Sequence, residues 1–291
     1  MPQLRIGTSG WSYPRWRGDF YPAGLAHHGE LGYLAQHLRT VEVNASFYGL
    51  QRPETYRAWA EQVPDDFVFA VKGSRYITHL KRLTDPETAL ANFFASGLLA
   101  LGRTLGPVLW QLPENLHLDL PRLAAFIALL PHSTESAARL AGRHDARVEG
   151  RAFLEPDGDR PVRHAVEVRH DSYLDTGFVE LLRTAGIALV VSDGAGEWPM
   201  LADVTAEFCY LRLHGPRLLY AGGYSAAELD TWATRIRAWT AGSAPPDLPT
   251  VTGQPPHEPD GRDVYVYFDN DSDGRAPFDA ADLATRLARP R

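Results

Sequence analysis

The sequence predicts a (β/α)8 TIM-barrel-like fold in a single domain, residues 1–291. Eight short runs rich in β-branched and aromatic residues recur along the chain, and segments with helical periodicity separate them. A strand–helix repeat of this number in a chain of this length is typical of a parallel barrel. An open doubly wound sheet is the alternative, but GTSGWS, after the first run, matches the Gly-rich phosphate loop of that fold only in part.

The expected elements follow the chain in order. The predicted strands are residues 4–9, 40–45, 67–72, 107–112, 165–170, 188–193, 208–214 and 263–269. Arg52-Pro53 and Asp85-Pro86 each predict the start of a helix, because proline is favoured in the first helical turn. Ser225 with Glu228 forms a capping box, which predicts a further helix before the last strand.

Three irregular stretches have different expected places. Loops that follow strands form the active face of a barrel, and loops that precede strands lie on the opposite face. Residues 241–262 are rich in Pro and Gly, so we expect an irregular loop away from the site. We expect residues 132–163 on that same face, with one short helix around Glu135 to Gly142. Residues 10–28 follow the first strand, and Trp11 or Trp16 is predicted to line the pocket unless these rings pack into the core.

Strand parity gives the direction of the polar side chains. In AVEVRH, residues 165–170, Val166 and Val168 form the apolar set that faces the helices, so Glu167 and Arg169 are predicted to point inward. The same count predicts further inward residues, namely Glu42, Asn44, Ser46, Lys72, Gln111, Tyr210, Arg212, His214, Tyr265, Tyr267 and Asp269. Most lie near the carboxyl ends of their strands, where barrel enzymes hold their sites.

Buried charges on one barrel axis must pair, bind a ligand or bind a metal, because an unpaired ion costs several kcal/mol to bury. The structural alternative to a functional site is an ion network in which Glu42 and Glu167 pair with the cations Lys72, Arg169 and Arg212. The functional interpretation favours an enzyme of open reaction class. Its candidate catalytic residues are Glu167, Glu42, His214 and Lys72. Its candidate ligand-binding residues are Arg169, Arg212, Asn44, His79, Gln111, His170, Trp11, Tyr267, Asp269 and Asn270.

The cations at the mouth suggest a small anionic ligand. Arg169 and Arg212 are predicted to form one clamp for a phosphate, phosphosugar or carboxylate, since guanidinium groups bind such anions bidentately. Glu167 or Glu42 is then the candidate general base, with His214 or His170 as its acid partner.

Two other functions stay open at this point. Glu42, Glu167, Asp193, His214 and Asp269 could converge on a divalent metal, as in barrel phosphodiesterases of the endonuclease IV type or barrel sugar isomerases. The chain has no His-x-His or His-Glu-x-x-His motif, so no metal or other cofactor is predicted and a divalent metal is the alternative. A retaining glycosidase is disfavoured because the fourth strand offers no carboxylate at its end. The remaining alternative is a non-catalytic protein that binds an anionic metabolite.

Composition limits the classes of partner that the protein is expected to bind. Lys and Arg number 29 against 36 Asp and Glu, a net charge of −7, which disfavours nucleic acid and an anionic membrane surface as partners. The single Cys209 leaves no intramolecular disulfide and no Cys-cluster metal site. Neither an apolar signal segment nor a run of about 18 apolar residues is found, so we expect a cytoplasmic protein without membrane contact. Composition leaves the oligomeric state open.

Seven ordered segments carry a family resemblance. They are IGTSGW with FYP, VEVNASFYG, FAVKGSRYITH, WQLPEN, VEVRHDSY, YLRLHG and YFDND. Together they span nearly the whole chain and resemble the signature segments of the DUF72 (YecE-like) family. The resemblance implies a TIM-barrel-like fold and no particular activity. The family pattern has Asn-Asn where this chain has Asp269-Asn270, which adds a potential carboxylate to the mouth.

Overall fold

The computed structural model describes residues 2–253 and 257–288, and within them eight parallel strands close into a barrel in chain order, β1 to β8. The (β/α)8 prediction is confirmed. Their bounds are β1 (Leu4–Ser9), β2 (Thr40–Val43), β3 (Val68–Lys72), β4 (Leu105–Gln111), β5 (His164–Glu167), β6 (Ala188–Asp193), β7 (Phe208–Leu213) and β8 (Asp263–Phe268). The described chain divides into two compact units. The first consists of the residues up to Glu42 together with those from Arg169 onward, and the second consists of Val43–Val168.

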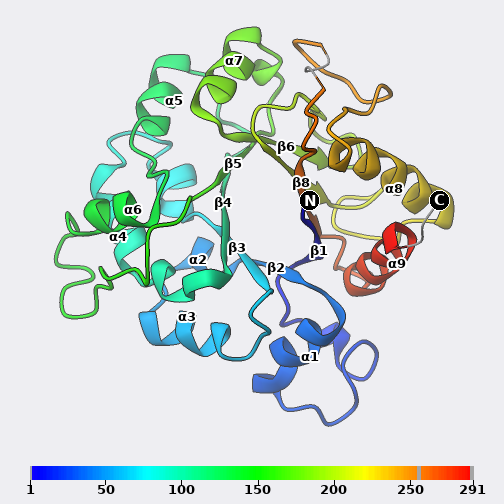
Figure 1. The fold of residues 1–291 in the computed structure, drawn as a ribbon, viewed down its shortest axis with the longest axis horizontal. Coiled ribbons are helices and arrows are strands. Elements are labelled where there is room, and N and C mark those ends of the chain that lie inside the picture. Colours follow the sequence, from blue (N-terminus) through cyan, green and yellow to red (C-terminus); the bar gives the residue numbers. More distant parts are fainter. Residues whose placement is uncertain (1, 254–256, 289–291) are drawn as a thin grey trace. The chain divides into compact units, whose positions relative to one another are not determined.

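The first unit holds β1, β6, β7, β8 and most of β2. Its helices are α1 (Glu30–His37), α7 (Thr176–Ala185), α8 (Ala226–Thr240), α9 (Ala276–Ala288) and the short 3-10 helices Pro14–Trp16, His27–Gly29 and Asp171–Tyr173. The predicted capping box starts α8, because Ser225 Oγ accepts the Glu228 N–H and the Glu228 carboxylate accepts the Ser225 N–H. Helices α8 and α9 lie side by side, and α9 packs on β1 (Figure 1).

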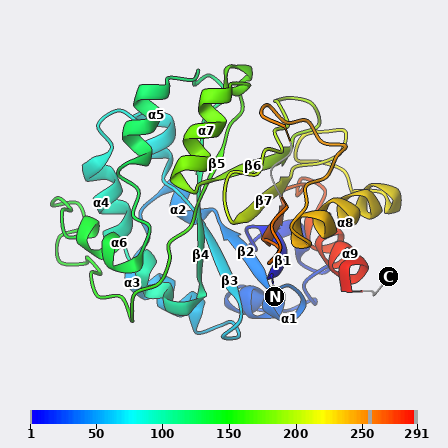
Figure 2. The ribbon, with the colours of Figure 1, turned by 45° about the horizontal axis from the view of Figure 1, so that its top comes forward.

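The second unit holds β3, β4 and β5. Its helices are α2 (Ala45–Tyr48), α3 (Pro53–Ala60), α4 (Glu87–Ala95), α5 (Leu120–Ile127), α6 (Thr134–Ala141), a 3-10 segment Leu98–Thr104 and a π-helical turn Tyr76–Leu80. Pro53 is the first residue of α3, and α4 begins directly after Pro86, as predicted. Helix α6 confirms the short helix expected around residue 135, and it lies beside α4 in both ribbon views (Figures 1 and 2).

Five strands end earlier than predicted. β2 ends at Val43 because α2 begins at Ala45, which leaves Asn44 with helical backbone angles. β5 ends at Glu167, and His170 instead caps a 3-10 helix by accepting the Ser172 N–H on Nδ1. β4, β7 and β8 each end one residue before the predicted end, at Gln111, Leu213 and Phe268. The parity count therefore does not extend to the residues beyond these ends, whose directions are set by the following turns and loops: Asn44, Ser46, Arg169, His170, His214 and Asp269.

The loop 241–262 agrees with its predicted face. Its described residues form no helix or strand, and residues 254–256 lie outside the described chain. Asp203 accepts the N–H groups of Val251 and Thr252 on its carboxylate, and the Ala202 N–H donates to the Pro249 carbonyl. Since residues 202 and 203 precede β7, the loop lies at the amino ends of the strands.

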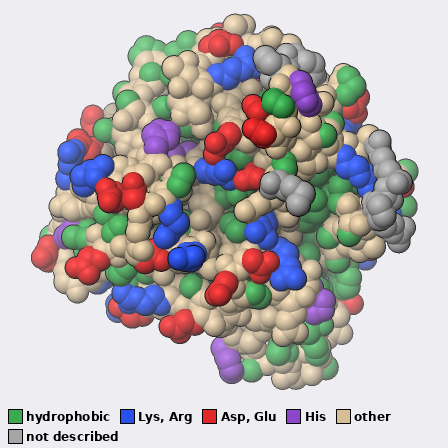
Figure 3. Space-filling view, in the orientation of Figure 1, with side chains coloured by type: hydrophobic (Ala, Val, Ile, Leu, Met, Phe, Trp, Pro, Cys, Tyr) green, Lys and Arg blue, Asp and Glu red, His purple; other side chains and the backbone are tan. Residues whose placement is uncertain are grey.

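The surface shows the mixed charge that composition predicts. In Figure 3, Lys and Arg side chains lie interspersed with Asp and Glu on the face in view. None of the helices in the described ranges is both long and apolar enough to cross a membrane. Cys209 on β7 is buried, and burial raises the pKa of its thiol to about 12.

Candidate active site

A buried ion pair forms the base of the candidate site. Arg212 on β7 donates from Nη2 to Glu42 Oε1 at 2.8 Å and from Nε to Glu42 Oε2 at 3.0 Å, and both side chains are fully buried. β1 and β8 separate β2 from β7 in the strand order, so these side chains can meet only on the inner side of the strands. The inward direction predicted for Glu42 and Arg212 is therefore confirmed.

Hydroxyl groups complete the surroundings of Glu42. Ser9 donates its hydroxyl to Oε1 at 2.6 Å, and Tyr210 donates to Oε2 at 2.7 Å. A buried ion pair is stable only when hydrogen bonds also satisfy its remaining lone pairs, as they do here. For Glu42 and Arg212, this is the self-satisfied ion network that the sequence offered as the structural alternative.

Asp269 connects this pair to the surface. Its Oδ2 lies 2.9 Å from Arg212 Nη2 and 3.1 Å from His214 Nδ1, and its side chain is 16% exposed. His214 Nε2 lies 3.3 Å from Arg212 Nη1, which can only donate, so the imidazole proton belongs on Nδ1 and faces Asp269. Arg212 and His214 thus hold Asp269 in one orientation at the outer end of the network.

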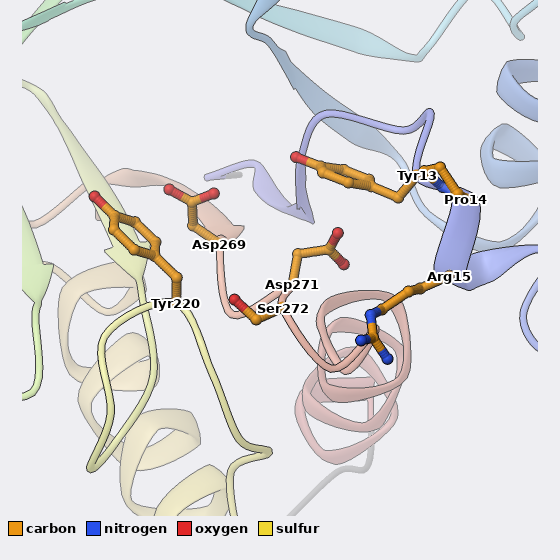
Figure 4. Close-up of a pocket in the computed structure, with 7 residues that line it drawn as sticks. All are labelled: Tyr13, Pro14, Arg15, Tyr220, Asp269, Asp271 and Ser272. Atoms are coloured by element: carbon orange, nitrogen blue, oxygen red, sulfur yellow. The ribbon is translucent and has the colours of Figure 1, made fainter.

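A pocket of about 360 Å³ opens beside Asp269 (Figure 4). Its lining comes from the loops after β1, β7 and β8, and consists of Tyr13, Pro14, Arg15, Tyr220, Asp269, Asp271 and Ser272. In Figure 4 the two aspartates lie between Tyr13 on one side and Tyr220 on the other. The volume is in the range of small-molecule sites.

Asp271 is the titratable group of this pocket. Burial raises its pKa from 3.8 to about 7, and the charge of Asp269 adds to the rise. The Trp16 indole N–H, which donates to Oδ1 at 2.5 Å, and the charge of Arg15 oppose it. Asp271 therefore exchanges a proton near neutral pH, beside a second carboxylate that is paired with an arginine.

Two tyrosines flank the aspartates. The Tyr13 hydroxyl donates to the Ser9 carbonyl at 2.5 Å, and burial together with the charges of Asp269, Asp271 and Glu42 raises its pKa, so the phenol stays protonated. Tyr220 has a φ of 62°, in the left-handed region that costs a bulky residue about 1–3 kcal/mol. Hydrogen bonds fix it there, since its N–H donates to the His214 carbonyl and its carbonyl accepts the Ser272 N–H.

Arg169 forms a hydrogen bond with the Tyr220 side chain. Its Nη1 donates to the Tyr220 hydroxyl at 3.0 Å, and its guanidinium lies 4.1 Å from the ring centroid of Trp198. Trp198 is fixed in turn by its indole N–H, which donates to Ser192 Oγ. The clamp of Arg169 and Arg212 stays a prediction. Arg212 donates to the carboxylates of Glu42 and Asp269, and Arg169 contacts Tyr220 and Trp198.

The other predicted ligand-binding residues of this unit have local contacts. Asn270 is buried and donates to the Gly222 carbonyl and to Asp279. Tyr267 is buried with its hydroxyl 2.8 Å from Thr40 Oγ1. Trp16 packs among Phe20 and Tyr21, the core packing that was the alternative for these rings. Trp11 is half-buried and accepts the Tyr21 hydroxyl on its carbonyl.

The predicted site residues of the second unit form a separate set. Lys72 is buried, with Nζ 4.5 Å from the Phe47 ring centroid, and the His79 ring lies 5.1 Å from the same ring. Glu167 is fully buried and Gln111 is 7% exposed. Asn44 is half-buried. Their predicted functional roles remain predictions.

Sequence reasoning did not select Asp271, Tyr13, Arg15, Tyr220 or Ser272 as site residues. Asp271 follows Asp269 by two positions in YFDND, and Tyr13 lies in the aromatic loop expected at the mouth. The sequence therefore indicated that both residues lie near the site. No pattern in the sequence indicates Tyr220, whose placement depends on its left-handed backbone.

The described residues contain no group of three or more His, Cys, Asp and Glu side chains arranged to hold a metal ion. Asp193, one of the five metal ligands considered, instead accepts the Tyr224 hydroxyl at 3.0 Å, and burial raises its pKa. Glu42 is surrounded by an arginine and two hydroxyl donors. Glu42 is thus already paired with a cation, and the divalent metal stays an alternative.

Comparison with known proteins identifies the family. The family model described as "Protein of unknown function DUF72" matches residues 5–291. The chain belongs to the DUF72 family. Curated relatives match over less than half of their length: the UPF0759 protein YecE of Escherichia coli strain K12 is 32% identical over 129 residues, which is 44% of each chain. The UPF0759 protein YunF of Bacillus subtilis strain 168 is 28% identical over 38% of this chain and 40% of that protein.

Solved DUF72 structures share the fold. A DUF72 family protein from Thermotoga maritima has a TM-score of 0.70 at 23% identity, with 99% of this chain and 100% of that chain covered. Another from Enterococcus faecalis has a TM-score of 0.69 at 16% identity, over 99% and 97% of the two chains. At these identities the likeness shows the fold alone, so any activity of this DUF72 chain must be argued from its own pocket.

Proposed function

We propose that the protein is an enzyme that performs acid–base chemistry in the pocket of Asp269 and Asp271, on a small substrate that carries a phosphate or carboxylate group. One observation carries the proposal. Two carboxyl groups share a pocket, and their surroundings differ: burial raises the pKa of Asp271 to about 7, whereas Asp269 is paired with Arg212 at 2.9 Å. Unequal carboxyl pairs of this kind supply a general acid or base at neutral pH.

Each neighbour has a role in this proposal. Asp271 gives or takes the proton, and Asp269 stabilises positive charge that develops on the reacting atoms. Arg212 and His214 act as positioning residues through Asp269, with Glu42 neutralising the charge of Arg212. Glu167 and Lys72 remain candidate catalytic groups for which this pocket provides no role.

The anionic part of the substrate is supported by Arg15 and Arg169. Arg15 is exposed and lines the pocket, and Arg169 lies behind the Tyr220 hydroxyl that borders it. Guanidinium groups bind phosphate and carboxylate through paired N–H donors. Arg212 contributes no such donor in this proposal, because it is turned to Glu42 and Asp269.

The direct test is a pH titration of the aspartate carboxyl carbons by ¹³C NMR. One resonance should titrate near pH 7 in the parent protein and disappear in the Asp271→Asn variant, whereas it should persist in Asp65→Asn, a control at an exposed position. Inorganic phosphate should shift its midpoint upward, because a bound anion disfavours the second negative charge. An Asp271 midpoint near 4 would contradict the proposal.

Activity is then screened with chromogenic phosphate esters and carboxylic esters. Turnover of a substrate found in this way should fall by about a hundredfold or more in Asp271→Asn, since general acid–base groups contribute roughly 10²–10⁴-fold. Phosphate binding with no turnover of any substrate class would instead favour a binding protein. Turnover that survives Asp271→Asn with an unchanged pH profile would exclude Asp271 as the acid or base.

A further inference from the structure

Another pocket, of about 380 Å³, lies in the second unit, and we call it the Tyr48–Tyr76 pocket. Among the residues that line it, Tyr48 is 72% exposed, Tyr76 is 38% exposed and Leu80 is 63% exposed. These are three of the six exposed large hydrophobic residues in the described part of the chain. Apolar side chains gathered in one hollow mark a binding surface more than scattered ones do.

Local structure fixes these side chains outward. Tyr48 ends α2, directly after β2, and Tyr76 and Leu80 are the first and last residues of the π-helical turn after β3. Ser74 Oγ accepts the Tyr76 N–H, and Ile77 within the turn is fully buried, so the turn is anchored from below. π-helical turns are rare and occur frequently at functional sites.

A guanidinium group is held over one of the rings. Arg147 lies with its guanidinium carbon 5.3 Å from the Tyr76 ring centroid. Buried Asn92 on α4 exchanges two hydrogen bonds of 3.0 Å with Asp145, whose carboxylate also accepts the Arg147 N–H at 2.9 Å. These hydrogen bonds fix the backbone from which the exposed Arg147 side chain reaches Tyr76.

The charge of the lining is of one sign. Among the described residues that line the pocket, Arg75 and Arg147 are cationic and none is acidic. The Asp145 carboxylate accepts the Arg147 backbone N–H and the Asn92 side-chain N–H, and these two hydrogen bonds lower its pKa. The pocket thus presents aromatic rings together with two guanidinium groups.

We propose that the Tyr48–Tyr76 pocket binds a planar aromatic ring that carries an anionic group, as in a nucleoside monophosphate. The base stacks on an exposed tyrosine ring, which every nucleobase allows because each has a π-face. Arg75 and Arg147 bind the phosphate, since charge-assisted hydrogen bonds from guanidinium are strong and directional. This site is independent of the chemistry proposed for Asp269 and Asp271.

Isothermal titration calorimetry with adenosine 5′-monophosphate tests the proposal, with adenosine and inorganic phosphate titrated separately. We expect one adenosine monophosphate per chain, with adenosine and phosphate each binding more weakly. Arg147→Gln keeps the backbone N–H that Asp145 holds, and should weaken nucleotide binding about tenfold or more while adenosine binding stays unchanged. Tyr76→Ala should weaken both nucleotide and adenosine by about fivefold to a hundredfold.

The matched control is Arg143→Gln, an exposed arginine that pairs with Glu87 and does not line the pocket. Its nucleotide affinity should equal that of the parent. No binding of the nucleotide at millimolar concentration, or equal binding by parent, Arg147→Gln and Tyr76→Ala, would overturn the proposal. If adenosine bound as strongly as the nucleotide, the pocket would not recognise the anionic group. If inorganic phosphate bound as strongly as the nucleotide, the pocket would not recognise the aromatic ring.

Discussion

Two sets of buried polar groups differ in how they are satisfied. The Arg212 cluster of the first unit consists of Arg212, Glu42, Ser9, Tyr210 and Asp269, and the His164 cluster of the second consists of His164, Trp110 and Pro131. His164 is fully buried, accepts the Trp110 indole N–H on Nδ1 at 3.1 Å and lies with Nε2 2.8 Å from the Pro131 carbonyl. Because Trp110 can only donate, Nδ1 carries no proton and the imidazole is neutral. Burial lowers the pKa of His164 to about 4, which keeps it so.

The difference lies in where each set of contacts ends. His164 is satisfied by two neutral partners and needs no further group. The charges of Arg212 and Glu42 require additional hydrogen-bond partners, and their network continues through Asp269, which accepts from Arg212, to a pocket at the surface. Buried charge, more than buried polarity, therefore indicates a candidate site in this molecule.

The largest expected effect comes from removing the arginine. Arg212→Met leaves Glu42 buried without its cation, and breaking a buried pair in this way costs roughly 3–5 kcal/mol of unfolding free energy. Urea denaturation at pH 7 measures the loss. The double variant Arg212→Met with Glu42→Gln should recover part of it, and exposed Arg139→Met should change little. If the single variant unfolds with parental stability, the pair is not a structural requirement.

The buried neutral imidazole of His164 is expected to lower the stability of the protein only at acidic pH. The unfolded chain binds a proton at His164 below about pH 6.5 and the folded chain only below about pH 4, so the free energy of unfolding falls as pH drops through that window. The full loss is roughly 3 kcal/mol, from about 1.4 kcal/mol per pKa unit.

Denaturation of the parent and of His164→Gln at several pH values isolates this contribution. The stability difference between the two should be constant above pH 7 and should change by that amount between pH 6.5 and 4. A difference that does not vary with pH would mean that His164 has the same pKa in the folded and unfolded chains, and would contradict the lowered pKa.

The smallest effect is expected at the second arginine of the predicted clamp. Arg169→Ala removes a cation–π contact to Trp198 and one hydrogen bond to Tyr220. The expected loss is about 1–2 kcal/mol, below that of Arg212→Met. Inorganic phosphate binding, measured by calorimetry, should weaken in Arg169→Ala but not in Arg217→Ala, an exposed control. A larger stability loss than that of Arg212→Met would reverse the comparison.

Sequence patterns were sufficient for the fold and for the inward direction of Glu42 and Arg212. The eight runs gave the strands, and parity gave the direction of Glu42 and Arg212, because alternation along a strand is a local rule. Asp271 depends on partners far along the chain, since Trp16, which donates to it, lies 255 positions away. Its pKa also depends on burial by loops whose course no periodicity reports.

Arg169 illustrates the same limit. Parity was applied beyond the end of β5, where the chain turns into a capped 3-10 helix, so the predicted direction had no geometric basis. Tyr220 is similar, because a left-handed backbone at a tyrosine is decided by tertiary hydrogen bonds and not by residue preference.

The buried thiol makes the folded protein almost inert to alkylating reagents. Reaction requires the thiolate, and with a pKa of about 12 only roughly one thiol in ten thousand is ionised at pH 8. Cys209 can react at an ordinary rate only after local opening exposes it to water. The rate of modification in the absence of denaturant thus counts opening events at β7, the strand that also carries Arg212, and it does so without any introduced label.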